Sequence, residues 1–78
     1  MGNANVAVDG QALRRQRKLA GLSVTGLAEQ VGCTPAYISI LETRRERNCS
    51  PELFARIADT LGVEDRSTLL REPERSAA

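Results

Sequence analysis

Residues that begin and end helices recur at short intervals along this chain of 78 residues. Thr34-Pro35 and Ser50-Pro51 are strong start signals, because the hydroxyl oxygen accepts a hydrogen bond from an orphan backbone N–H and proline fits the first helical turn. Gly21, Gly32 and Gly62 suit the left-handed residue that commonly ends a helix. The segments between these signals are long enough for short helices only.

These boundaries predict an all-α fold, a compact bundle of five short helices. We expect the helices over residues 10–20, 24–30, 35–42, 52–61 and 65–70, with Asp9 capping the first and Ser23 the second. In the fourth, Leu53, Ile57 and Leu61 recur at helical spacing. Residues 1–8 lack periodicity and residues 71–78 are charged and small, so we predict a flexible arm, a domain over 9–70 and a flexible tail.

The composition excludes several classes of function. The chain has no His and two Cys, so it cannot assemble a four-ligand zinc site, and we expect no metal and no cofactor. We expect Cys33 to be a small buried side chain at a turn and Cys49 to be an incidental loop thiol. No nucleophile–base pair can be named, so an enzyme is not expected. With one Phe, one Tyr and no Trp, a stacking platform for single-stranded nucleic acid is not expected either.

The N-terminal sequence has neither a basic region nor a long apolar stretch, and no segment reaches membrane-spanning length. We therefore expect a cytoplasmic protein that does not engage membranes. Its net charge of +1 is unevenly distributed, since residues 1–50 hold seven basic and four acidic side chains and residues 51–78 hold four basic and six acidic ones. This distribution allows one end of the chain to face a polyanion.

The second and third expected helices are joined by a short segment around Gly32, which is typical of a helix-turn-helix. Their buried seam is expected to consist of Leu27, Ala28, Val31, Ile38 and Leu41. In this arrangement the third helix directs its other side chains outward.

The stretch "LAEQVGCTPAYISILE", with "GLS" before it and "PELFARIADTLGV" after it, resembles the Cro/CI/Xre family of helix-turn-helix DNA-binding domains. The resemblance extends over approximately residues 9 to 70 and implies a lambda-repressor-like fold. It also implies that the third helix lies in the DNA major groove, while the loop after it holds phosphates.

The resemblance and the outward positions together give a set of expected DNA contacts. The set is Ser23, Thr34, Pro35, Ala36, Tyr37, Ser39, Ile40, Thr43, Arg44, Arg45 and Arg47. The three arginines are expected on the phosphate backbone, and the second helix's N-terminus at Ser23 is a natural phosphate seat. Tyr37 has a second interpretation, as a core aromatic with its hydroxyl at the rim.

The sequence departs from that of many relatives in two places. Where this chain has Val24, at the start of the second expected helix, many relatives carry a Gln, and they often have long polar side chains where the third helix has Pro35, Ala36 and Ile40. Because it lacks the bidentate Arg–guanine and Gln–adenine contacts, discrimination would rest on apolar contacts, on DNA shape or on arginines from the loop.

The run "RRQRK" at residues 14–18 contains two kinds of position. Arg15 and Lys18 are expected on a solvated face rather than on nucleic acid. By the resemblance, Arg17 is expected to form a structural ion pair with Glu42.

The leading hypothesis is a sequence-specific, double-stranded DNA-binding regulator of transcription. A homodimer is expected from the family and because one short helix contacts too few bases, with a surface formed by the fourth and fifth helices or the C-terminus around Leu69 and Leu70. The alternative is a protein-interaction module, antitoxin-like or a regulatory partner, that keeps the fold with little DNA readout. Phage, developmental and antitoxin roles all fit the sequence.

Overall fold

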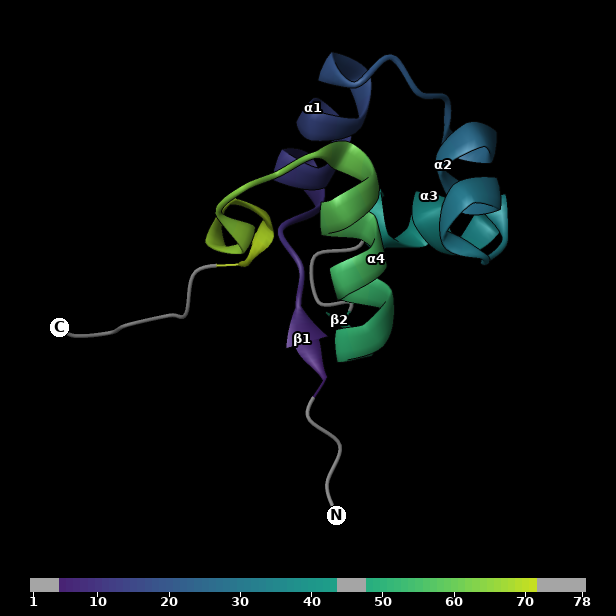
Figure 1. Ribbon diagram of the computed structural model, residues 1–78. Coiled ribbons are helices and arrows are strands. Elements are labelled where there is room, and N and C mark those ends of the chain that lie inside the picture. The colour runs from purple at the N-terminus through teal and green to yellow at the C-terminus, as the bar shows by residue number, and fades with distance from the viewer. Residues whose placement is uncertain (1–4, 44–47, 72–78) are drawn as a thin grey trace, which may run out of the picture.

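The computed structural model describes residues 5–43 and 48–71 (Figure 1). Their elements are β1 (Val6–Ala7), α1 (Gly10–Leu19), α2 (Val24–Val31), α3 (Pro35–Thr43), β2 (Asn48–Cys49), α4 (Pro51–Leu61) and the 3-10 helix η1 (Arg66–Leu69). Figure 1 shows α2 and α3 together on one side of α4 and η1 on the other side.

Each α-helix begins at a short polar side chain that accepts a backbone hydrogen bond. The Asp9 carboxylate accepts from the backbone N of Gln11 at 3.1 Å, and the hydroxyl oxygens of Ser23, Thr34 and Ser50 accept from backbone N atoms three residues further on at 2.9 to 3.1 Å. Since a helix's first N–H groups have no partner within the helix, these caps explain where the helices start.

One core holds the helices together. It takes apolar side chains from every helix, among them Leu13 of α1, Leu27 of α2, Leu41 of α3 and Ile57 of α4, all at most 1% exposed. α1 packs on α3 and on η1, while α2 packs on α3 and α4. The arrangement leaves one long face of α3 outside the core.

The segment before α1 differs from the expected flexible arm. Val6 pairs with Cys49 and Ala7 with Asn48 in an antiparallel register, and Val8, only 2% exposed, bridges to Leu70. A pairing of two residues has no periodicity that the sequence could reveal, and its partners lie far along the chain. Residues 1–4 and 72–78, the rest of the expected arm and most of the tail, lie outside the described residues.

The expectation of a fifth α-helix was wrong. Residues 5–43 and 48–71 form four α-helices followed by the single-turn η1, at whose start the Asp65 carboxylate accepts from the backbone N of Ser67 at 3.1 Å. The four residues of η1 form a single turn, which is shorter than the α-helix expected over 65–70. Leu69 is fully buried beneath α1, so it cannot form the expected dimer surface, while Leu70 is 39% exposed.

The expected environments of the two thiols are only partly correct, since Cys33 packs on the core without being fully buried and Cys49 is a buried strand residue. Cys49 lies in β2 and is 2% exposed, whereas Cys33 in the turn is half-buried, because pairing with β1 draws residue 49 inward. Burial raises the pKa of Cys49 to about 11, with a smaller contribution from Cys33. Both are free thiols. No helix among the described residues has the length and apolar character needed to cross a membrane.

Candidate nucleic-acid interface

The connection between α2 and α3 consists of Gly32, Cys33 and Thr34. Gly32 has a φ of 83°, a left-handed conformation that permits the chain to leave α2 sharply. Arg56 of α4 donates from Nη1 to the Val31 carbonyl at 3.2 Å and so ties the end of α2 to α4. This contact was not predicted from the sequence, since nothing local in the sequence relates residues 25 positions apart.

The outward face of α3 is uncharged. Ile38 and Leu41 are fully buried, as expected, and the side opposite them carries the residues expected to touch DNA. Of these, Pro35, Ala36, Ser39 and Thr43 are exposed, while Tyr37 and Ile40 are half-buried. Thr34 is exposed and its hydroxyl oxygen is occupied as a cap. We call the surface formed by Pro35, Ala36, Ser39, Ile40 and Thr43 the α3 outer face.

Tyr37 fits the second interpretation given above, a core aromatic with its hydroxyl at the rim, and its contact with DNA stays a prediction. Its ring packs against the core, and its hydroxyl donates to the carbonyl of Asn48 at 3.4 Å. The side chain therefore joins α3 to β2 while its polar end stays at the rim of the α3 outer face.

Thr43 and Ser39 differ in the hydrogen-bonding capacity that they offer. The Thr43 hydroxyl donates to the Ser39 carbonyl at 2.8 Å, so its proton is committed to the helix and only its oxygen and methyl group remain for a ligand. Ser39 is exposed one turn earlier on the same face. The α3 outer face thus offers small polar and apolar groups, without the bulk or charge of a long side chain.

The one charged residue of α3 is neutralised inside the fold. Glu42 binds Arg17 of α1 in a two-pronged pair, with Nε–Oε2 and Nη2–Oε1 distances of 2.6 and 3.0 Å. Arg17 also donates from Nη1 to the Leu22 carbonyl at 3.0 Å. The side chains are 9% and 5% exposed, and the hydrogen bond to Glu42 raises the pKa of Arg17 further. The expected ion pair is therefore present, and it keeps a carboxylate off the α3 outer face.

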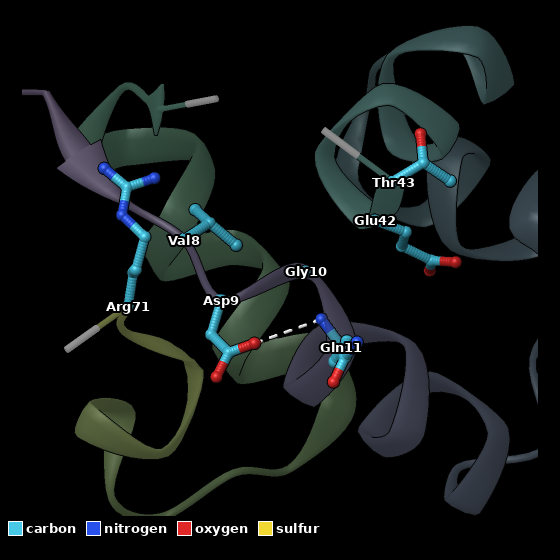
Figure 2. A pocket seen from close by; sticks show the side chains of 7 residues that line it. All are labelled: Val8, Asp9, Gly10, Gln11, Glu42, Thr43 and Arg71. Atoms are coloured by element: carbon cyan, nitrogen blue, oxygen red, sulfur yellow. Dashed lines mark hydrogen bonds between the residues drawn. The ribbon is translucent and has the colours of Figure 1, made fainter. Parts of the chain in front are cut away.

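A close backbone approach fixes α1 against the end of α3. A Cβ at Gly10 would lie 2.6 Å from both the Leu41 and the Glu42 carbonyl oxygens, far inside van der Waals contact. Beside this contact lies a half-open pocket of about 470 Å³, whose lining includes Asp9, Glu42 and Arg71 (Figure 2). Both carboxylates are already committed, Asp9 to the cap of α1 and Glu42 to Arg17.

Of the four remaining expected contacts, Ser23 falls among the described residues. Ser23 is exposed at the first turn of α2, where its hydroxyl accepts from Gly26. Arg44, Arg45 and Arg47 lie outside the described residues, although α3 ends at Thr43, immediately before them.

Several solved structures resemble this chain in fold and sequence, among them the following three. The N-terminal DNA-binding domain of SinR from Bacillus subtilis is 32% identical with a TM-score of 0.70, over 85% of this chain and 94% of that one. The restriction-modification controller protein C.AhdI from Aeromonas hydrophila is 36% identical with a TM-score of 0.67, over 76% and 88%. The clp gene regulator ClgR from C. glutamicum is 36% identical with a TM-score of 0.66, over 76% and 74%.

SinR has also been solved in complex with DNA, and that chain matches with a TM-score of 0.69 at 30% identity, over 76% of this chain and 95% of its own. This chain spans 56% of the matched chain in the SinR–SinI complex. A comparison with curated protein sequences found no match. A model of the helix-turn-helix domain matches residues 10–70. The chain belongs to the helix-turn-helix domain family, with Cro/Xre-type regulators as its structural relatives.

Proposed function

We propose that this protein binds double-stranded DNA with the α3 outer face in the major groove and thereby regulates transcription. The observation that carries this proposal is the uncharged α3 outer face on the second helix of a helix-turn-helix, from which the one carboxylate of α3 is withdrawn into a buried ion pair. A carboxylate left on that surface would repel phosphates, whereas small polar and apolar groups can approach base edges. Such a regulator would act in the cytoplasm.

Sequence readout would use the chemistry present on this face. Ala36 and Ile40 offer apolar surface for a thymine methyl group, and Ser39 offers a hydroxyl for hydrogen bonding. These contacts discriminate less than bidentate ones, so DNA shape would contribute much of the preference. Arg44, Arg45 and Arg47 would add about −2.7 to the slope of log K against log salt, if each neutralises one phosphate of B-DNA.

A homodimer would double this surface. Two copies would place their α3 helices in successive major grooves, with half-sites about 10 base pairs apart. Since Leu69 is buried, the dimer surface would use α4, the exposed residues of η1 or the C-terminus from Leu70 onward instead. SinR has been solved in complex with another protein, SinI, so a protein partner is a further expectation.

A charge placed on the α3 outer face tests the proposal. Ala36 is exposed, so Ala36→Glu should leave the fold intact, as circular dichroism can verify. We expect it to weaken binding to a labelled duplex by about tenfold or more, which is about 1.4 kcal/mol, through repulsion of the DNA. Thr68→Glu, on exposed η1, is the control with the same change in charge and should weaken binding far less. Equal affinities for the two variants would contradict the proposal.

A further inference from the structure

The side of α1 that faces away from the core is basic, with an exposed leucine among its cations. Gln11, Arg14, Arg15, Lys18 and Leu19 line a shallow groove of about 460 Å³. On the opposite side of the same helix, Ala12, Leu13 and Arg17 are buried. We call this groove surface the α1 outer face.

The cations of the α1 outer face differ from the other arginines in having no partner among the described residues. Within residues 5–43 and 48–71, no hydrogen bond or ion pair joins the side chains of Arg14, Arg15 or Lys18 to another residue. The other arginines of the same ranges are all engaged. Arg17 binds Glu42, Arg56 binds the Val31 carbonyl, Arg66 binds Asp59 and Arg71 binds Asn48. Three cations that have no partner in the described part of the chain are thus concentrated on one helix that carries no acidic residue.

Leu19 adds an exposed apolar side chain next to these cations. It is 74% exposed, more than any other large hydrophobic residue that the structure describes. A single exposed leucine is ordinary on a protein surface. Here it lies one helical turn from Arg15 and beside Lys18, so an apolar side chain and cations can be engaged together.

Two occupants of this face are disfavoured by its chemistry. A second copy of the chain in a two-fold contact would bring the same cations against one another, because such an interface is self-complementary. DNA phosphates would use the cations but not the leucine, and the face lies on the side of α1 opposite the one that packs on α3. An acidic protein segment with apolar residues satisfies both features.

We propose that the α1 outer face is a docking site for an acidic amphipathic helix of a partner protein. The carboxylates of the partner pair with Arg14, Arg15 and Lys18, and one of its apolar side chains packs on Leu19. The site is separate from the α3 outer face, so a partner could bind it while the protein holds DNA. It does not depend on the proposed DNA-binding function.

The test is a titration of the ¹⁵N-labelled chain, followed by NMR, with a synthetic peptide of about 18 residues, which is above the length at which isolated helices are marginal. Glu lines one face of this peptide and Leu the neighbouring face, and a scrambled peptide of equal composition is the control. We expect amide shifts concentrated at residues 11–19. Arg15→Glu and Leu19→Ser should each weaken binding about tenfold. Arg66→Glu, a matched charge reversal on η1, should leave it unchanged.

Several results would overturn this proposal. One is the absence of shifts up to about 1 mM peptide, the weak limit of specific association. Another is equal binding of Leu19→Ser and the unaltered chain, since it would show nonspecific charge attraction only. If the scrambled peptide bound as tightly as the amphipathic one, this too would show nonspecific charge attraction only. If duplex DNA shifts residues 11–19 and displaces the peptide, the face belongs to the DNA-binding surface instead.

Discussion

Arg17→Ala removes the side chain that ties α1, α3 and the start of α2 together. The substitution leaves the Glu42 carboxylate, 5% exposed, without the two guanidinium contacts at 2.6 and 3.0 Å. It also leaves the Leu22 carbonyl without its side-chain donor. Loss of one partner of a buried ion pair costs about 3–5 kcal/mol, and we expect about 3 kcal/mol because this pair retains some exposure. For a domain of this size that corresponds to a fall in Tm of about 12 °C or more.

Arg15→Ala is the matched control, because Arg15 lies on the same helix, exposed and without a partner among the described residues. It should change the free energy of unfolding by no more than about 0.5 kcal/mol. The double variant Arg17→Met/Glu42→Leu should recover most of the lost stability, since the cost arises from the unpaired carboxylate. Thermal melts of the purified variants measure these differences in stability. Equal shifts for Arg17→Ala and Arg15→Ala, or no recovery in the double variant, would refute the reasoning.

Three further predictions concern packing, protonation and capping. Gly10→Ala should destabilise the fold by about 2–3 kcal/mol in urea titrations, because its Cβ meets two backbone oxygens that cannot move independently; an unchanged midpoint would contradict this. The pKa of Cys49 is raised from an ordinary 9.0 to about 11 in the fold, so its contribution to stability is complete below pH 9 and is lost as the pH rises through 11. Urea titrations of Cys33→Ser at pH values below 9 and up to 11 should show this loss of stability, and the same titrations of Cys33→Ser/Cys49→Ala should lack it. Equal losses in the two variants would count against Cys49 as the group responsible. Thr34→Ala should cost about 1 kcal/mol through loss of the α3 cap, and Thr34→Asn should retain most of the stability.

Local signals in the sequence were enough to place the four α-helices. Each cap and turn acts within three or four residues, so the polar or glycine residue and the helix end that it sets stand next to each other in the sequence. These residues are Asp9, Ser23, Thr34, Ser50 and Gly32. The outward positions of α3 followed from the same helical spacing.

Features formed by distant residues were not predictable in this way. The pairing of Val6 with Cys49 buries a thiol and orders the segment before α1, and neither residue carries a strand signal of its own. The contact of Arg56 with Val31 joins residues 25 positions apart. Arg17 and Glu42 are equally distant in the chain, and their pairing was expected from the resemblance to a family and not from their spacing.

The measurement that tests the central claim most directly is selection from a random double-stranded DNA library at a series of salt concentrations, followed by sequencing of the bound fraction. We expect enrichment of a palindromic motif with half-sites about 10 base pairs apart, and loss of that enrichment in Ala36→Glu. Binding that weakens with salt but enriches no motif would contradict sequence-specific recognition. A chain that retains no DNA even at low salt would contradict the DNA-binding function itself.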